Sequence, residues 1–205
     1  YTLSRQRIAP AAVRIEGDWS SAAYLLAAGA LAGSVTVTGL SQNTVQGDKN
    51  IIRILEEMGA DISCSETAVT VSSRPLHAID CDLNGTPDLV PVVAVLAAHA
   101  HGISRISGVA HLAYKESDRL QGIFDLLSSF GISVMRYPDG FGITGGRMQG
   151  SRIPAANDHR MFMAAVIAGL ASSSPTEIAE SPNAAMISYP AFLPDIRALG
   201  GICRT

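Results

Sequence analysis

The sequence predicts an α/β fold in which a unit of about 70 residues occurs three times. Asp18, Asp88 and Asp158 recur at that interval, and each one precedes an alanine-rich apolar run. Each run is followed by a short alternating segment and then by a second, amphipathic segment that ends at a glycine. Because one pattern of helix and strand repeats over the whole chain, the fold is expected to consist of equivalent supersecondary units.

The alanine-rich runs are predicted to form the first helix of each unit. They occupy residues 17–28, 87–98 and 157–168. Because these segments are apolar on all sides, the helices are expected to be buried and closely packed. An aspartate at the start of a helix is a favourable N-cap, which is sufficient reason for Asp18 and Asp158. Asp88 is either a third cap or, if it is the copy that faces a substrate, a functional base.

The rest of each unit alternates between strand and helix. Alternating side chains predict strands at residues 34–38, 104–108 and 176–180. Amphipathic helices are predicted at residues 50–58, 118–127 and 191–199, with Gly59, Gly131 and Gly200 at the position after the helix that favours glycine. Further strands are predicted at residues 60–64, 132–135 and 201–203. The charged positions of the second helices indicate that one face of each helix lies in solvent.

The expected architecture is a single domain over residues 1–205, with three buried helices at the centre and sheets outside them. The units extend roughly over residues 14–75, 76–146 and 147–205. The period is longer than that of most solenoid repeats, which favours a closed, pseudo-threefold domain over an open array.

Composition excludes several classes of protein. Hydrophobic residues make up 47% of the 205 residues and charged residues 16%, which argues against intrinsic disorder. A net charge of −3 without a dominant basic stripe argues against general nucleic-acid binding. The longest apolar stretches, such as residues 22–32, are too short to span a bilayer.

The cysteines and the first residue bear on where the chain comes from. Cys64, Cys81 and Cys203 are widely spaced and odd in number, which predicts reduced thiols and a cytoplasmic protein. The chain begins at Tyr1 and not at Met, which suggests a fragment or a processed product.

A cluster of charged residues lies before the second helix of the middle unit, in the string from His111 to Arg119. Lys115 and Arg119 are four residues apart and would share one face of a helix, with Glu116 beside them. Two cations at a helix N-terminus form an anion site. The alternative is an exposed helix start with intrahelical ion pairs, capped by Ser117 or Asp118.

A second cluster opens the third alanine-rich run. His159 and Arg160 follow the predicted cap Asp158, and therefore fall in the first turn of the helix. The helix dipole disfavours positive charge at that end, so the two cations conflict with local preference. Such a conflict is expected where an anion binds.

Four strings together are similar, in order and spacing, to the C-terminal half of EPSP synthases. They are Gly-Asp-Trp-Ser-Ser-Ala at 17–22, Gln-Gly-Asp at 46–48, Lys-Glu-Ser-Asp-Arg-Leu at 115–120 and Asn-Asp-His-Arg-Met at 157–161. The third and fourth strings are specific to that family as a pair, and the resemblance extends over residues 14–203. It implies one lobe of the enolpyruvyl transferase fold, built from three βαβαββ units. The other lobe, which the family carries mainly upstream, is absent from this chain.

The resemblance implies a reaction and two catalytic residues. In the family, the enolpyruvyl group of phosphoenolpyruvate is transferred to the 5-hydroxyl of shikimate 3-phosphate, in the route to chorismate and the aromatic amino acids, and phosphate is released. Asp88 matches the acceptor of the hydroxyl proton, and Glu116 matches the donor of a proton to the methylene carbon. The resemblance implies no metal and no organic cofactor, and it implies a cytoplasmic protein that is a monomer at full length.

The resemblance also implies a set of substrate-binding residues. Lys115 and His111 match contacts to shikimate 3-phosphate. Arg119 and Arg160 match guanidinium groups that hold the carboxylate and phosphate of phosphoenolpyruvate, a task suited to bidentate arginine. Asp158 and His159, which belong to the Asn-Asp-His-Arg-Met string, would support the phosphoenolpyruvate site.

The sequence departs from the family near its end. Where the family usually has Lys-Ser-Tyr-Pro, this chain has Ile187 followed by Ser-Tyr-Pro. An aliphatic side chain cannot replace an ammonium group that faces phosphate, so the parent enzyme is expected to be weakened or to have another cation. Two alternatives remain open: a catalytically impaired ligand-binding or scaffold homologue, and the related transferase that acts on UDP-N-acetylglucosamine.

Overall fold

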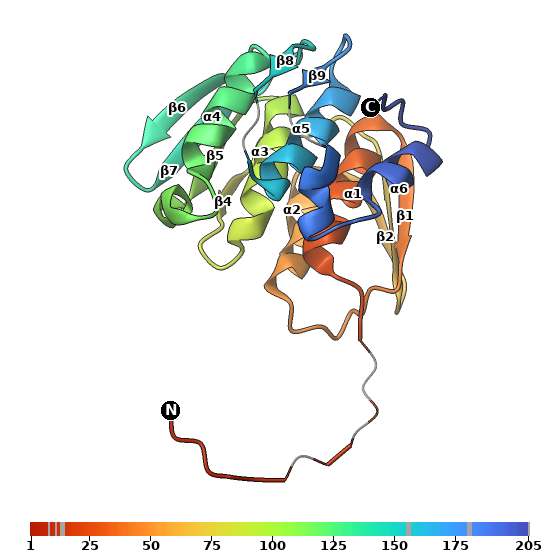
Figure 1. The fold of residues 1–205 in the computed structure, drawn as a ribbon. Helices are drawn as coiled ribbons and strands as arrows, with labels where there is room; N and C mark the ends of the chain where they lie inside the picture. The colour runs from red at the N-terminus through yellow and green to blue at the C-terminus, as the bar shows by residue number, and fades with distance from the viewer. Residues whose placement is uncertain (8, 11, 13–14, 155–156, 180–181, 205) are drawn as a thin grey trace.

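Three alanine-rich helices lie at the centre of the molecule and contact one another (Figure 1). They are α1 (Trp19–Ala32), α3 (Val90–His99) and α5 (His159–Ala171). In the computed structural model, which describes residues 1–7, 9–10, 12, 15–154, 157–179 and 182–204, most of their side chains are buried. Because alanine has no atoms beyond Cβ, it lets the helices approach closely, and their apolar surfaces on all sides are removed from water.

A three-stranded sheet lies on one side of these helices and a four-stranded sheet on the other, as predicted for an α/β fold with its sheets outside (Figure 1). The first is antiparallel, in the order β1 (Ser34–Thr38), β3 (Ala68–Ser72), β2 (Asp61–Cys64). Its alternation is clear in β3, where Val69 and Val71 are fully buried while the hydroxyl of Thr70 pairs with that of Thr36 at 2.8 Å on the exposed face. Such period-two burial is the reason these segments form strands.

The second sheet has four strands and contains one parallel pair. Its order is β4 (Asp80–Asp82), β5 (Ile103–Ser107), β7 (Gly140–Thr144), β6 (Ser133–Tyr137), with β4 parallel to β5 and the other pairs antiparallel. The middle of the chain therefore runs β4–α3–β5–α4–β6–β7, which is the complete βαβαββ order expected for one unit.

The second helix of each unit is amphipathic and ends as the sequence predicts. These helices are α2 (Ile51–Glu57), α4 (Arg119–Ser129) and α6 (Phe192–Ala198). The glycines that follow them, Gly59, Gly131 and Gly200, have φ angles of 89°, 77° and 98°. Because a residue with a Cβ rarely adopts this left-handed conformation, glycine ends the helix at these positions.

Short 3₁₀ helices lead into or follow the longer elements. They are η1 (Gly47–Asn50), η2 (Pro87–Leu89), η3 (Ala110–Tyr114) and η4 (Pro182–Ile187). η2 continues directly into α3, so Asp88 lies within helical backbone and not before it.

The third unit has less strand than predicted. Its strands β8 (Arg152–Ile153) and β9 (Glu177–Ile178) form a two-residue parallel pair, and Glu180, the last residue of the predicted strand, lies outside the described residues. The prediction of a strand at 201–203 is wrong. In the first two units the corresponding strand pairs with the next strand along the chain, whereas no described segment pairs with residues 201–203. The carbonyl of Cys203 instead accepts a hydrogen bond from Nε of Arg197.

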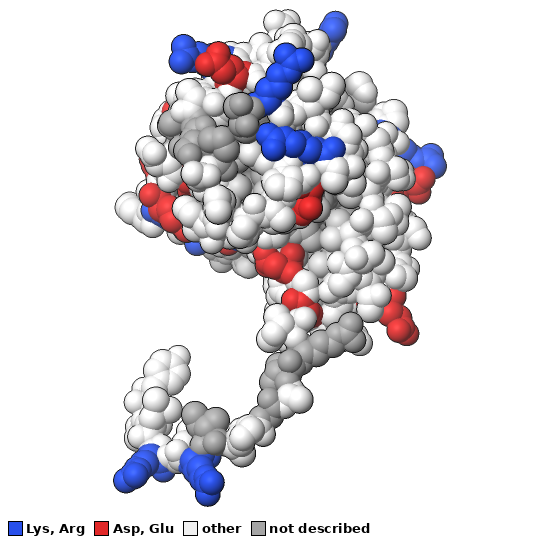
Figure 2. Space-filling model, turned by 45° about the vertical axis from the view of Figure 1, so that its right-hand side comes forward, with Lys and Arg blue, Asp and Glu red and all other residues white. Residues whose placement is uncertain are grey.

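Two surface properties bear on the kinds of partner. On the face drawn in Figure 2, most Lys and Arg residues of the folded part lie in its upper half and most Asp and Glu residues in its lower half, and the blue residues form no continuous patch. Within the described part of the chain, no helix combines the length and apolar character needed to cross a bilayer.

Candidate active site

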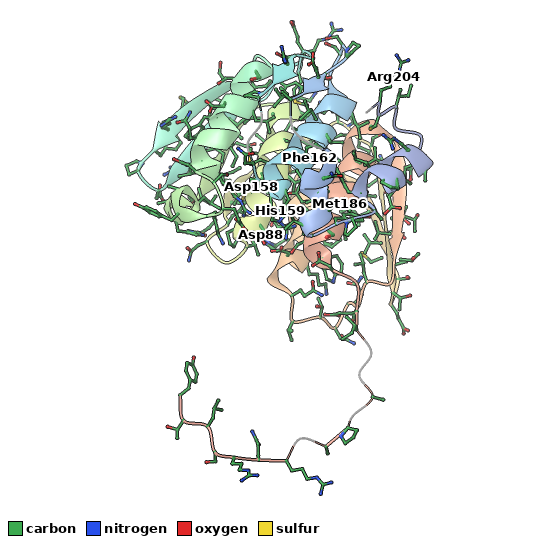
Figure 3. All side chains as sticks on the ribbon, in the orientation of Figure 1. Asp88, Asp158, His159, Phe162, Met186 and Arg204 are labelled. Atoms are coloured by element: carbon green, nitrogen blue, oxygen red, sulfur yellow. The ribbon has the colours of Figure 1, made fainter. Side chains whose placement is uncertain are left out.

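Five of the charged residues singled out in the sequence meet at the N-terminal ends of α3, α4 and α5: Asp88, Glu116, Arg119, Asp158 and Arg160. Figure 3 shows the labelled Asp88, Asp158 and His159 together at one end of the central helices. Asp88 comes from η2, Arg119 is the first residue of α4, and Arg160 lies in the first turn of α5. The helix starts of two units therefore supply one cluster.

Arg119 is the centre of the cluster and is almost completely buried, with 1% of its side chain exposed. Its Nε donates to Asp158 at 2.8 Å, Nη1 to Asp88 at 2.8 Å and Nη2 to Glu116 at 2.7 Å. Burial lowers the pKa of a guanidinium, but the three carboxylates outweigh it and raise the pKa of Arg119. Each nitrogen thus holds one carboxylate in place through a charge-assisted hydrogen bond.

Asp158 joins α5 to this arginine. One carboxylate oxygen, Oδ1, accepts from the backbone N–H of Arg160 at 2.8 Å and of Met161 at 3.3 Å, which is the predicted N-cap. The other oxygen, Oδ2, accepts from Arg119 and from the hydroxyl of Ser117 at 3.1 Å. Burial raises the pKa of Asp158, but Arg119 and the cap hydrogen bonds overcome that effect and hold the pKa below its usual value. Because both oxygens are engaged and buried, Asp158 positions its neighbours.

Asp88 is not a helix cap, so that reading of the repeat is wrong. Asp18 and Asp158 accept hydrogen bonds from the first turns of α1 and α5, whereas the N-cap of η2 is Thr86. The carboxylate of Asp88 instead bridges two guanidiniums, accepting from Arg119 at 2.8 Å and from Nη2 of Arg160 at 3.2 Å. It is about a third exposed, so one part of the carboxylate faces outward. The alternative in which Asp88 is a functional group therefore gains support.

The environment sets the ionisation of Asp88. Burial raises its pKa, but the charges of Arg160, Arg119 and Lys115 outweigh that effect and hold the pKa below the usual range. The carboxylate is therefore ionised at neutral pH and can accept a proton. An anion that neutralised the two arginines would make it more basic.

Arg160 has unused hydrogen-bonding capacity. Its side chain is 8% exposed, yet Nε and Nη1 are buried and have no hydrogen-bond partner among the described residues. A buried N–H left without an acceptor costs about 1–3 kcal/mol, and more on a charged group. This arrangement is expected where a bound anion supplies the acceptors, because a guanidinium matches carboxylate and phosphate oxygens in geometry.

His159 and Lys115 lie beside the cluster in different settings. His159 is buried in the first turn of α5, where burial first and the neighbouring Arg160 second lower its pKa, so the ring is neutral at pH 7. Lys115 is exposed and extended just after η3, four residues before the first residue of α4. A shared helix face of Lys115 and Arg119 was expected only if the segment between them were helical. That condition is not met, because Lys115 is extended and α4 begins only at Arg119.

His111 and Ile187 lie further from the ion pairs. His111 is half-buried in η3, and it makes no hydrogen bond or ion pair with the described residues. Ile187 is the last residue of η4, which packs against α5, and the residue is 74% exposed. The expected lysine position thus carries an exposed aliphatic side chain on an element next to α5.

Two further groups bear on this region. The sequence indicated no role for Tyr24, and it singled out Asp48 only as part of the Gln-Gly-Asp string at 46–48. Tyr24, fully buried in α1, donates its hydroxyl to the backbone carbonyl of Arg160 at 3.2 Å. Asp48 accepts from the hydroxyl of Ser20, and burial, opposed by that hydrogen bond and reinforced by Asp88, raises its pKa. A departure from the repeat was available as a signal for Tyr24, because alanine stands at the equivalent positions of the other two units.

The chain matches one family of known proteins. Residues 4–196 match the family described as EPSP synthase (3-phosphoshikimate 1-carboxyvinyltransferase). Two curated relatives named 3-phosphoshikimate 1-carboxyvinyltransferase are similar to it: the chain is 42% identical over 193 residues to that of Methanocorpusculum labreanum and 46% identical over 191 residues to that of Methanosarcina mazei. These matches include 94% and 91% of this chain but 46% and 44% of the relatives. The chain therefore spans about half the length of the curated relatives it matches.

Solved structures also match the chain over nearly its whole length and over about half of their own length. An EPSP synthase from Acinetobacter baumannii superimposes with a TM-score of 0.78 at 29% identity, over 90% of this chain and 46% of that one. The enolpyruvyl transferase NikO from Streptomyces tendae superimposes with a TM-score of 0.66 at 18% identity, over 94% of this chain and 45% of that one. At that low identity the second likeness concerns the fold alone.

Proposed function

The chain belongs to the EPSP synthase (3-phosphoshikimate 1-carboxyvinyltransferase) family, and on that premise we propose the activity of the protein of which it forms part. This protein transfers the enolpyruvyl group of phosphoenolpyruvate to the 5-hydroxyl of shikimate 3-phosphate and releases phosphate. The chain forms the C-terminal lobe, from three units at about 14–75, 76–146 and 147–205. A second lobe completes the site.

One observation in this chain carries the proposal. Arg160 presents two buried N–H groups without acceptors beside Asp88, a carboxylate that its own environment keeps ionised. An anion site next to a proton acceptor is what an addition to phosphoenolpyruvate requires. The cation binds and polarises the anionic substrate while the carboxylate receives the proton of the attacking hydroxyl.

The proton balance assigns the two carboxylates different roles. In the addition step, the hydroxyl oxygen bonds to C2 of phosphoenolpyruvate, Asp88 takes the hydroxyl proton, and Glu116 gives a proton to the methylene carbon. In the elimination step, the new methyl group returns a proton to the carboxylate of Glu116 and the carbon–carbon double bond forms again. The bond between C2 and the phosphate oxygen breaks, and phosphate leaves with the proton that Asp88 held. Glu116 sits on Nη2 of Arg119 at 2.7 Å, so a substrate anion that takes this nitrogen frees the carboxyl group for its task.

The binding roles follow from exposure and from free donors. Arg160 holds the carboxylate or phosphate of phosphoenolpyruvate, and Lys115, which is exposed, reaches the phosphate of shikimate 3-phosphate with His111 beside it. Arg119 uses three of its five N–H donors on carboxylates, so it orders the cluster first and contacts substrate through the donors that remain. Asp158 and His159 set the position of the first turn of α5.

The test is phosphate release by the full-length protein with saturating phosphoenolpyruvate, with and without shikimate 3-phosphate. Release that depends on this acceptor is expected, and Asp88→Asn is expected to lower kcat by about 10²–10⁴-fold, the usual contribution of a positioned proton acceptor. Asp18→Asn is the matched control, because Asp18 holds the equivalent position of the first unit and only caps α1. Equal activity of the two variants would contradict the role given to Asp88.

The same assay separates the alternatives. Release that requires UDP-N-acetylglucosamine would assign the related transferase activity, and binding of phosphoenolpyruvate without any release would assign an impaired, ligand-binding homologue. The exposed Ile187 is the observation that favours the last outcome. The 205-residue chain alone is expected to show no turnover, because half of the proposed cleft belongs to the other lobe.

A further inference from the structure

We propose that Tyr24 is a positioning residue for Arg160, which its hydroxyl holds in place across the contact between α1 and α5. The inference rests on the proposed function, because it concerns how the anion-binding arginine is held. It adds a residue from the first unit to a site otherwise built by the second and third. Among the described residues, no hydrogen bond joins Tyr24 to a carboxylate of the cluster, and its complete burial keeps it away from substrate.

The sequence repeat marks Tyr24 as an exception. It stands six residues after Asp18, and the residues six after Asp88 and Asp158 are Ala94 and Ala164. Alanine at these positions suits a core in which three helices approach closely. A tyrosine in one copy adds a ring and a hydroxyl to the interior, where each polar group needs a hydrogen-bond partner.

The structure shows where that partner lies. The hydroxyl donates to the backbone carbonyl of Arg160 at 3.2 Å, between residues that are 136 positions apart in the chain. The ring meets Phe192 of α6 edge to face, with 6.3 Å between the centroids and 79° between the planes. Because the ring is packed on one side and the hydroxyl is bonded on the other, Tyr24 has a fixed orientation.

A role for Tyr24 in proton transfer is excluded by its environment. Burial is the main cause that raises the pKa of its hydroxyl, and among the charges that act on it are the guanidinium of Arg160 and the carboxylate of Asp158. The group therefore remains a neutral O–H donor over the whole range of physiological pH. Its contribution is to positioning, because the hydroxyl of Tyr24 holds the backbone carbonyl of Arg160 that accepts its hydrogen bond.

The consequence for the site follows from helix geometry. Arg160 lies in the first turn of α5, and the aim of its side chain depends on where its backbone lies. Its guanidinium reaches Asp88 at 3.2 Å, near the long end of the hydrogen-bonding range, so a small shift of this turn removes the contact. Misplacement of a binding group by about 1 Å can cost as much as 10²-fold in rate.

Tyr24→Phe in the full-length protein tests the proposal, because it removes the hydroxyl and keeps the ring. The expected result is a rise of about tenfold in the KM for phosphoenolpyruvate, with a change of less than about twofold in the KM for shikimate 3-phosphate. A merely structural role would not produce such a split between substrates. The loss of one buried hydrogen bond is expected to change the unfolding equilibrium constant by about fivefold.

Tyr189→Phe is the matched control. Its hydroxyl donates to Asp195 at 2.7 Å and lies outside the ion-pair cluster, so the substitution also deletes one tyrosine hydrogen bond. Both KM values are expected to stay as in the unmodified protein. Equal changes of both KM values in Tyr24→Phe, or a loss of stability with no change in either, would overturn the proposal.

Two further measurements apply if Tyr24→Phe does not fold or if the unmodified protein is inactive. If Tyr24→Phe does not fold, Phe192→Leu loosens the ring and keeps the hydroxyl, and a KM for phosphoenolpyruvate that stays unchanged in this variant counts against the proposal. If the unmodified protein releases no phosphate, the proposed function fails. The dissociation constant of phosphoenolpyruvate, measured by calorimetry on the same variants, then replaces KM, and a tenfold weakening in Tyr24→Phe alone still supports the role of Tyr24.

Discussion

Asp158→Asn removes one charge from the centre of the cluster and leaves its shape nearly unchanged. Asparagine is as good an N-cap as aspartate, so the hydrogen bonds to the first turn of α5 are expected to persist. What is lost is the pairing with Arg119, whose side chain is as fully buried as that of Asp158. Asp18→Asn makes the same substitution at the cap of α1, where the structure records no ion pair among the described residues.

The magnitude follows from burial. Breaking a buried ion pair by removing one partner destabilises a protein by about 3–5 kcal/mol, because the remaining charge is left without compensation. Arg119 keeps Asp88 and Glu116, both partly exposed, so a value near 3 kcal/mol is expected. Asp18→Asn loses only the interaction of an exposed charge with the helix dipole, about 0.3–1 kcal/mol. The pair of variants therefore isolates the interaction with Arg119.

The assay is urea unfolding of the 205-residue chain, followed by a spectroscopic signal. With a slope of about 2–3 kcal/mol per M, a loss of 3 kcal/mol lowers the midpoint by about 1–1.5 M while the slope stays the same. If the two variants differ by less than about 1 kcal/mol, the buried pair does not stabilise the fold as argued.

Three further predictions concern pH and the position of the missing lysine. Asp158 has a lowered pKa in the folded state, so the stability it contributes is present above its unfolded pKa of about 3.9 and is lost as the pH falls through the folded value; Asp158→Asn is expected to flatten the acid limb of a plot of urea midpoint against pH. His159 also has a lowered pKa, because burial and Arg160 disfavour its charged form, and burial lowers the pKa of His99 as well. The chain is therefore expected to lose stability as the pH falls below about 6.5, and His159→Gln should reduce that loss between pH 7.5 and 5.5. Ile187→Lys is expected to lower the KM for phosphoenolpyruvate of the full-length protein by about tenfold, whereas Met186→Lys, which adds the same charge at the neighbouring exposed position, should not; equal effects would indicate a general gain from positive charge.

Much of the fold was predictable because its determinants are local. The buried helices follow from apolar runs of a dozen residues, and their N-caps at Asp18 and Asp158 from the residue just before each run. Glycines at the ends of the second helices and the alternation of the strands require no knowledge of distant residues. The strand predicted at 201–203 fails for the opposite reason, since a strand needs a partner and periodicity alone does not supply one.

The sequence predicted which residues belong to the candidate site, but it did not predict which of them contact one another. The two charged strings indicated anion binding because cations at helix starts conflict with the helix dipole, and the structure brings Arg119 and Arg160 to the same carboxylate, Asp88. Lys115 and Arg119 do not share a helix face, because a spacing of four places residues on a common face only where the backbone is helical, and the segment between them is not. Nothing in the strings indicated that Arg119 would be buried.

The sequence by itself determined the repeat, the alternation of helix and strand, the local caps and the residue types of the cluster, because these depend on neighbours within one or two turns of the chain. Only the tertiary structure decided which charges meet. Arg119 and Asp158 are 39 residues apart, Asp88 and Arg160 are 72 apart, and Tyr24 and Arg160 are 136 apart. Contacts at such separations exist only after the three helices have packed, since burial and the aim of each side chain are properties of the packed core.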